Sequence, residues 1–412
     1  MENVLAAPQQ RRTDAALRTL ALISAAHWVS HFHLLALPML FPFLKTALGV
    51  GYIELGFALT VFAVVSALTQ APVGYLVDHF GARRILLIGL SAGGLALVLV
   101  GLHLSYPLLI ASATVLGLAN SVYHPSNYAI LSAHMDEARM GRAFSIHTFA
   151  GFLGGAVAPA IVAALLTSIG GVGALIVSGA VGPVVALLLI VFGLPEAGAT
   201  HARVTGGARQ QNVITPALIV LTIFFMLLGL SNAGIGNFGV VALMNGYGAS
   251  FSAANIALTA FLGASAVGVL AGGLLADHTH RHGQVAAACF ALNAVIVLLI
   301  AMVALSPVLL TTAMTAAGFL GGLIAPSRDM LVRNAAPSGA AGRAFGIVST
   351  GFNFSGILSP LLFGWIMDQD LPRWVFGISA AFMMLTVGLA PFTERKSRDD
   401  LATDTNRRDD TN

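Results

Sequence analysis

Two histidines one helical turn apart are the first residues whose types and spacing could do chemistry. His27 and His31 share one face of a helix, as do Trp28 and Phe32, while His33 points elsewhere. The two imidazoles could hydrogen-bond a small molecule, handle protons or bond a neighbouring helix. A transition metal is the fourth alternative, but no further ligand stands at helical spacing, and a metal site needs several.

A second polar group lies in the segment around residue 124. Asn120, Tyr123, His124 and Asn127 follow the 3–4 spacing of one helical face. Pro125 stands beside them, and because proline has no backbone N–H it frees a carbonyl and can bend the helix. We expect these side chains to line a polar site, with a purely architectural bend as the alternative for Pro125.

Two later segments add amides and a charged pair. Asn232 and Asn237 lie among glycines, and Arg328 stands next to Asp329. Adjacent residues on a helix diverge by about 100°, so Arg328 and Asp329 are expected to have different partners. An inward Arg328 would attract an anionic group; alternatively, its side chain extends to the water interface.

Several chemistries are excluded. The sequence contains no His-Glu-x-x-His, Gly-x-Ser-x-Gly or Walker motif, so we predict no enzyme activity and no cofactor. The single cysteine, Cys289, excludes an internal disulfide and a cysteine-based metal cluster.

The composition identifies the environment in which these residues must work. Of 412 residues, 57% are hydrophobic and 9% are charged, and the mean hydropathy is +0.87. So few charges cannot coat a soluble protein, which indicates an all-α membrane protein. The pI is near 9.3, but the net charge is only +3, and we expect no binding to nucleic acid.

Twelve apolar stretches have about the length that a bilayer requires. They lie at 18–44, 52–77, 85–104, 106–131, 143–167, 171–194, 214–243, 251–276, 284–305, 308–332, 343–367 and 373–392.

The basic residues predict the orientation. Of the 20 Lys and Arg, only Lys45 and Arg373 fall on one face, Arg328 lies within a span, and the others share the opposite face. The positive-inside rule therefore puts both termini in the cytoplasm. The expected parts are a tail 1–17, a six-helix bundle 18–194, a linker 195–213, a second bundle 214–392 and a tail 393–412.

The two halves are copies. Segment 58–62 recurs as 257–261, and Asp78-His79 as Asp277-His278, at an offset of 199 residues. Pro125-Ser126 recurs as Pro326-Ser327, and 141–144 as 342–345, at an offset of 201. Because each half has an even number of spans, the copies are related by an axis along the membrane normal. Two such bundles around a central cavity predict alternating access.

Here the chain resembles the major facilitator superfamily. The loop 74–84 is similar to the signature that this superfamily carries between its second and third spans. The gating residues that the resemblance implies are Gly74, Asp78, Gly81, Arg83, Arg84 and Asp277. Asp78 could accept hydrogen bonds from the N–H groups at a helix N-terminus. In this superfamily spans one, four, seven and ten line the cavity, which makes the polar residues named above candidates for contact with the cargo.

Within the superfamily, segments 121–126 and 141–159 look like the fosmidomycin-resistance branch. The strict antiporter signature of span five is not matched, because Pro159 lies four residues after Gly155. Helix bends are expected at Pro125, Pro159, Pro326 and Pro360.

These observations predict a secondary transporter of a small neutral or anionic organic solute, working by uptake. A heteroaromatic vitamin such as a flavin is one candidate. The alternatives are a proton-coupled exporter of drugs and, with less weight, a transition-metal importer that uses His27 and His31. If protons are coupled, His31, His124 or Glu54 would carry them. We expect a monomer in a bacterial inner membrane.

Overall fold

The chain forms two compact units, Met1–Thr205 (unit 1) and Gly206–Asn412 (unit 2). The computed structural model describes residues 2–136, 139–197, 215–279, 281–336 and 341–389. At residues 2–13, 141, 277 and 341–343 it describes the backbone alone. Most of the predicted linker and all of the tail 393–412 therefore lie outside the described residues.

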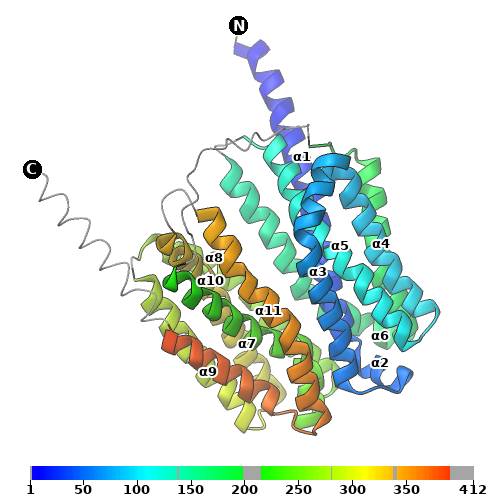
Figure 1. The fold of residues 1–412 in the computed structure, drawn as a ribbon, viewed down its shortest axis with the longest axis vertical. Helices are drawn as coiled ribbons and strands as arrows, with labels where there is room; N and C mark the ends of the chain where they lie inside the picture. The colour runs from blue at the N-terminus through cyan, green and yellow to red at the C-terminus, as the bar shows by residue number, and fades with distance from the viewer. Residues whose placement is uncertain (1, 137–138, 198–214, 280, 337–340, 390–412) are drawn as a thin grey trace, which may run out of the picture. The chain divides into compact units, whose positions relative to one another are not determined.

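Each unit is built of long apolar helices (Figure 1). The helices of unit 1 are α1 (Glu2–Met39), α2 (Phe41–Leu48), α3 (Tyr52–Phe80), α4 (Ala82–Leu102), α5 (Tyr106–His134) and α6 (Met140–Val191). Those of unit 2 are α7 (Pro216–Tyr247), α8 (Phe251–Asp277), α9 (His282–Met302), α10 (Pro307–Ala335) and α11 (Ala341–Asp368), followed by a shorter apolar helix, Trp374–Leu389.

The predicted spans fall on these helices, with two differences in how they are divided. The described residues contain 10 helices long and apolar enough to cross a membrane. One reason is that α6 covers two predicted spans. Gly170 interrupts it with φ 74° and ψ 175°, which glycine adopts readily. A straight helix of 52 residues would be about 78 Å long, so α6 accounts for two crossings. The other reason is that Trp374–Leu389 is short.

The structure divides the first predicted span into two helices, whereas it joins two predicted spans in α6. Helix α1 ends at Met39 and α2 begins at Phe41, with Leu40 at φ −90° and ψ 0° between them. Pro42 stands in the first turn of α2, where its missing N–H costs nothing. At its other end α1 continues back to Glu2, so the predicted tail 1–17 is helical in the described part.

The packing pattern repeats between the units. In unit 1, α1 packs on α6, α3 on α5, and α4 on α5 and α6; in unit 2, α7 packs on α11, α8 on α10, and α9 on α10. Glycines allow the close approaches. Gly117 of α5 faces the Phe62 carbonyl of α3, and Gly318 of α10 faces the Phe261 carbonyl of α8. Close backbone contact through small residues is how helices associate in lipid.

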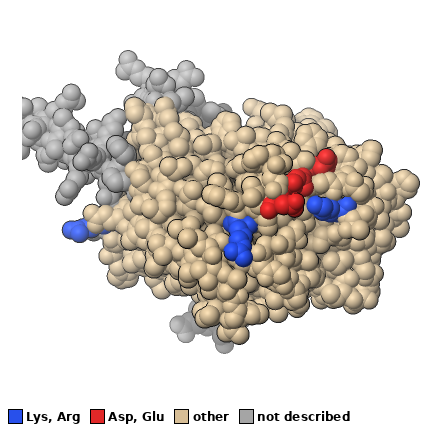
Figure 2. Space-filling model, turned by 90° about the horizontal axis from the view of Figure 1, so that it is seen from below, with Lys and Arg blue, Asp and Glu red and all other residues tan. Residues whose placement is uncertain are grey.

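Charged side chains are sparse on the face seen in Figure 2, where a run of red groups lies beside a blue one and the other blue groups stand apart on an uncharged surface. The two bases predicted for the outer face both lie over tyrosine rings. Lys45 Nζ is 4.1 Å from the centroid of Tyr52, and Arg373 Cζ is 4.8 Å from that of Tyr247. Such cation–π contacts hold a base beside the aromatic rings typical of membrane interfaces.

Candidate functional site

Four histidines from three helices of unit 1 form one cluster, which we call the histidine cluster: His27 and His31 of α1, His124 of α5 and His147 of α6. The ring centroid of His27 lies 4.8 Å from that of His31, 5.6 Å from His124 and 4.1 Å from His147. His27 is therefore the centre of the cluster. The sequence pattern predicted that His27 and His31 share a face, but it missed His147.

Glycines of α6 bring the cluster together. A Cβ at Gly151 would lie 2.7 Å from His27 Cε1 and 2.9 Å from His31 Cδ2. One turn later, Gly154 faces the Trp28 carbonyl at a distance that no larger residue would allow. The segment Gly151-x-x-Gly154 therefore places α6, and with it His147, directly on α1. This glycine spacing is the signal that could have pointed to His147.

Several ring nitrogens in the cluster have no hydrogen-bond partner. His27 Nδ1 lies 2.8 Å from the His147 carbonyl oxygen, so it donates there. His27 Nε2, His124 Nδ1 and both ring nitrogens of His147 are buried without a partner among the described residues. Because a buried polar atom without a partner is costly, these nitrogens are available to something that the helices themselves do not supply.

His33 shows what a structural histidine looks like in this fold. It lies on α1 but faces the second half of α6, where its Nε2 is 3.0 Å from the Ser178 carbonyl oxygen. Trp28 and Phe32 stack on each other, with centroids 5.0 Å apart and planes at 8°. Phe32 is buried in the unit rather than open to a cavity.

The polar face predicted on α5 is divided among different surroundings. Asn120 Nδ2 donates to Ser66 Oγ of α3 at 2.8 Å, and Tyr123 is part of the apolar core. Asn127 is fully buried, and neither atom of its amide has a partner among the described residues. Of the predicted set, the structure brings only His124 into the histidine cluster; the contacts of the others with a cargo stay a prediction.

Unit 2 holds a different arrangement around Arg328 of α10. Its guanidinium carbon lies 4.8 Å from the ring centroid of Phe225 and 5.4 Å from that of Phe352. We call these three residues the arginine site. The side chain of Arg328 is 17% exposed, against 47% for Asp329. Asn232 and Asn237 are half-buried on α7 of the same unit.

The expectation that Arg328 and Asp329 have different partners was wrong. Arg328 Nε donates to Asp329 Oδ1 at 2.8 Å, and its Nη2 lies 2.8 Å from the same oxygen. The Cβ directions of neighbours do diverge, but the long arginine side chain folds back across the helix surface to reach the carboxylate. The pair is thus an ion pair within one helix.

No metal site accompanies these groups. Nowhere in the described ranges do three or more His, Cys, Asp or Glu gather in a way that could hold a metal ion. In the histidine cluster, His27 and His147 stack with their planes at 12°, which does not aim their nitrogens at one point. Glu54, the acid proposed as a proton carrier, instead accepts from the Gly51 N–H at 2.9 Å and caps α3.

The loop between α3 and α4 is held by a residue that the sequence pattern missed. Glu196, which follows α6, accepts from the Arg83 N–H at 3.0 Å and so caps the N-terminus of α4. A Cβ at Gly81 would lie 2.8 Å from its carboxylate, and Gly81 has φ 94°. Asp78 is exposed and makes no hydrogen bond or ion pair with the described part of the chain.

The other predicted gating residues are Gly74, Arg84 and Asp277. Gly74 is half-buried with open space beside its Cα, and Arg84 is exposed. The side chain of Asp277 lies outside the described residues. The gating role of this loop stays a prediction, and so do the bends at the four prolines. Pro125, Pro326 and Pro360 lie inside α5, α10 and α11, and Pro159 lies in the part of α6 that precedes the interruption at Gly170.

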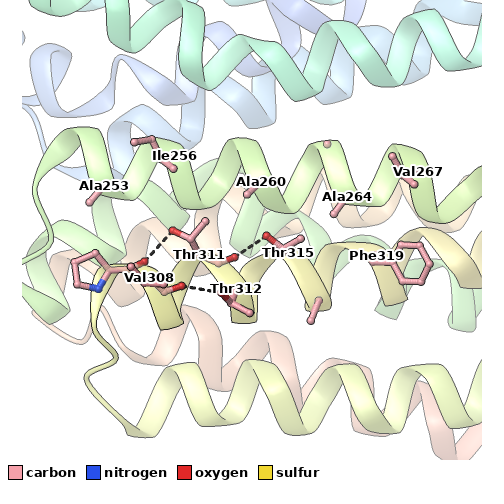
Figure 3. A pocket seen from close by; sticks show the side chains of 13 residues that line it. Ala253, Ile256, Ala260, Ala264, Val267, Val308, Thr311, Thr312, Thr315 and Phe319 are labelled. Carbon is pink, nitrogen blue, oxygen red and sulfur yellow. Dashed lines mark hydrogen bonds between the residues drawn. The ribbon is translucent and has the colours of Figure 1, made fainter.

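An apolar groove runs between α8 and α10 in unit 2, with a volume of about 1010 Å³ (Figure 3). Ile256 and Val267 line one side of it. Thr311, Thr312 and Thr315 line the other, and each donates its hydroxyl to a carbonyl of its own helix. The hydroxyl donors are thus used within α10, and the other side chains that line the groove are apolar.

The family model described as Major Facilitator Superfamily matches residues 23–244 and 219–409. The chain belongs to the Major Facilitator Superfamily. It is therefore a multi-pass membrane transporter of small molecules and not an enzyme, as the duplicated spans predicted.

Similar members of the superfamily differ in what they are named for. The chain is 25% identical to the fosmidomycin resistance protein of Escherichia coli over 67% of this chain and 69% of that protein. It is 25% identical to the uncharacterized MFS-type transporter YfnC of Bacillus subtilis over 63% and 65% of the two chains. It is 28% identical to the probable sulfoacetate transporter of Cupriavidus necator over 47% and 44%.

Solved superfamily structures share the fold. A bacterial homologue of the human lysosomal transporter Spinster, in an inward-facing and occupied conformation, matches with a TM-score of 0.75 at 15% identity, over 91% of this chain and 96% of that one. The nucleoside transporter NupG matches with a TM-score of 0.74 at 15% identity, over 92% and 99%. These likenesses concern the superfamily fold and not the cargo.

Proposed function

We propose that this superfamily member is a secondary transporter that takes up a small organic anion together with a proton. The observation that carries the proposal is the arginine site of unit 2. A base inside a membrane-spanning helix is expensive, and such residues mark the path of a substrate or ion. Arg328 is such a base, within the span Pro307–Ala335.

The geometry of Arg328 suits an anion that binds through two oxygens. A guanidinium has five N–H donors, and Asp329 Oδ1 takes that of Nε and one of the two on Nη2. The rings of Phe225 and Phe352 hold the plane of the group in place. A preorganised planar fork with unused donors recognises carboxylate, sulfonate or phosphate better than a lysine would.

Asp329 acts as the counter-ion of the empty site. With 47% of its side chain exposed, it can turn towards water more easily than Arg328, of which 17% is exposed. An arriving anion then takes over the pairing with Arg328, and the base is at no time left without a negative partner. At this site a cationic cargo would meet a carboxylate that is already paired with Arg328.

The names of the relatives support the anionic class. Two of them are a probable sulfoacetate transporter and a probable L-galactonate transporter, the latter 25% identical over 34% of this chain. Both names denote organic anions at neutral pH. A flavin or another heteroaromatic vitamin stays the alternative cargo, because the histidine cluster offers ring faces and unpaired nitrogens.

The proposed direction is uptake across a bacterial inner membrane, with both termini in the cytoplasm. The strict antiporter signature of span five is not matched, so that motif does not imply export. The likeness to the fosmidomycin resistance protein favours a second candidate, a proton-driven exporter. A comparison of uptake into right-side-out vesicles with uptake into everted vesicles distinguishes import from export.

A ligand screen tests the anion proposal. The full chain in detergent is heated with sulfoacetate, L-galactonate, neutral sugars, riboflavin and organic cations, since a bound ligand raises the unfolding temperature. We expect the anions to stabilise the protein. Arg328→Gln should weaken anion binding roughly 100-fold, the value of a lost charged hydrogen-bond pair. Arg333→Gln, which removes an exposed base of the same helix, is the matched control.

The result that contradicts the proposal is equally specific. If only neutral compounds or riboflavin stabilise the protein, and Arg328→Gln leaves their binding unchanged, the arginine site is not a cargo site.

A further inference from the structure

The histidine cluster of unit 1 has unsatisfied nitrogens that the anion proposal does not use. We infer that this cluster is the proton-binding site of the transporter, and that it takes up a single proton in step with the negative charge of the cargo. The inference rests on the proposed uptake of an anion for its role in transport, although the proton site itself can be measured without any cargo.

The cluster can accept one proton but not two. His147 is fully buried with both ring nitrogens unpaired, and His27 and His124 each have one unpaired nitrogen. A neutral imidazole has one donor and one acceptor nitrogen, so acceptor positions for a proton remain in the cluster. Because the other three rings lie within 5.6 Å of His27, a second positive charge would be repelled strongly.

Nearby rings can stabilise one positive charge. Tyr128 of α5 lies 5.7 Å from His124 and 6.1 Å from His147 between centroids, and Phe152 of α6 lies 6.2 Å from His31. His27 meets His31 edge-on at 88° and His124 at 68°. Aromatic faces attract a cation, so the charge can be shared within the cluster.

No fixed negative charge balances such a proton in unit 1. The described aromatic residues outside the cluster whose rings contact it are Tyr128 and Phe152, and the electrostatic partners of His31 are His27, His124 and His147. Among the described residues of the unit, no Asp, Glu, Lys or Arg interacts with the cluster. Burial away from water penalises an unbalanced charge.

This penalty is what ties the proton to the cargo. In the inferred cycle the cluster is neutral in the empty transporter and protonated in the loaded one, so that cargo and proton together carry less net charge through the membrane. By thermodynamic linkage, the proton must then favour the anion by the same factor. A monoanion and one proton together carry no net charge, so their movement does not oppose the inside-negative membrane potential.

The first experiment measures the proton directly. The full chain with ¹⁵N-labelled histidine is placed in lipid nanodiscs and titrated without cargo, and ring signals are assigned by single His→Gln variants. We expect the cluster to bind one proton as a unit, so that the ring signals of the four histidines shift together. Sulfoacetate should shift that step to higher pH. His33→Gln is the matched control, since His33 is buried on α1 but bonded elsewhere.

Two results would overturn the inference. Either the four rings titrate independently of one another, or all four stay neutral while sulfoacetate binds through Arg328. In the second case the anion proposal stands and the proton site falls. If the cluster binds one proton as a unit but no anion binds, the proton site stands and the anion proposal falls. An anion that binds through Arg328 without shifting the step overturns the coupling of proton and cargo. Because His147→Gln could impair folding, His124→Gln, at a half-buried position, provides the second variant.

The second experiment measures how the accumulation of cargoes of different charge in proteoliposomes depends on a potassium diffusion potential. L-galactonate is a monoanion, so with one proton its accumulation should be independent of potential. Sulfoacetate is a dianion, so its accumulation should fall about tenfold for each 59 mV, inside negative. His124→Gln should make L-galactonate behave as sulfoacetate does, and His33→Gln should not. Wild-type accumulation of L-galactonate that falls with potential contradicts the inference.

Discussion

The two units share a packing scheme but hold opposite chemistry at equivalent places. Gly154 packs on Trp28 in unit 1, and 201 residues later Ser355 packs on Gly229 in unit 2. At that offset, His124 and His147 correspond to Ala325 and Val348, and Asn127 corresponds to Arg328. At these equivalent positions unit 1 therefore has two histidines and an asparagine, and unit 2 has an arginine and no histidine.

One position shows how this difference arises. Gly151 leaves room for His27 and His31, whereas its equivalent, Phe352, fills that room and lies against the Arg328 guanidinium. The duplicated glycines that hold α3 on α5 and α8 on α10 have stayed, while the side chains in the interior have changed. A duplicated scaffold can therefore divide two tasks, proton and anion, between copies that still pack alike.

The largest expected effect concerns the two copies of the gating loop, which carry Asp78 and Asp277. It tests whether the two loops differ in their importance for transport, as the two sites differ in their chemistry. Asp78→Asn should slow transport roughly tenfold, about 1.4 kcal/mol of barrier, because the loop between α3 and α4 carries the fuller gating signature. Asp277→Asn, in the degenerate copy, should slow it less. Initial uptake rates at matched membrane abundance provide the measurement. Unchanged uptake in Asp78→Asn contradicts the gating role, and equal losses remove the asymmetry.

A smaller expected effect concerns Gly151, the position at which the interiors of the two units differ. Gly151→Ala adds a Cβ 2.7 Å from His27 Cε1, so overpacking should destabilise the protein by about 1–3 kcal/mol and lower its unfolding temperature. Gly155→Ala is the control, because its Cβ would meet Leu35 Cδ1 at an ordinary 3.4 Å. Equal stability of the two variants would show that α6 can move away from α1, and that the cluster is not held by close packing.

The smallest expected effect concerns the cap of α4. Glu196→Ala removes the acceptor for the Arg83 N–H and should cost about 1 kcal/mol of stability. Glu196→Gln keeps an acceptor oxygen and loses only the interaction of charge with the helix N-terminus, so it should cost less. The unfolding temperatures of the two variants show which substitution costs more stability. A larger loss for Gln than for Ala would mean that the carboxylate has another task.

The fold and part of the candidate site could be predicted from the sequence. The apolar stretches predicted the helices, and the 199- and 201-residue offsets predicted the duplication, because both are linear patterns. The i,i+4 spacing placed His27 beside His31 for the same reason. His147 and Glu196 were missed because their partners are 120 and 113 residues away, and spacing along the chain carries no sign of such contacts.

The error at Arg328 has a different origin. Helical geometry gives the direction in which a side chain starts, and it correctly separates Cβ atoms of neighbouring residues. It does not say where a guanidinium four bonds further out will settle. Phe225, on α7, and Phe352, on α11, decide that position, together with Asp329.

By itself the sequence determined that this is a duplicated helical membrane protein, since hydropathy and repetition are properties of the chain's order. It also determined which residue types are available inside the membrane. Only the tertiary structure decided that four histidines meet in one unit and that an arginine lies between two phenylalanines in the other. The reason is physical: helix–helix approach depends on where glycines let two backbones touch, and side chains acquire partners only after that approach.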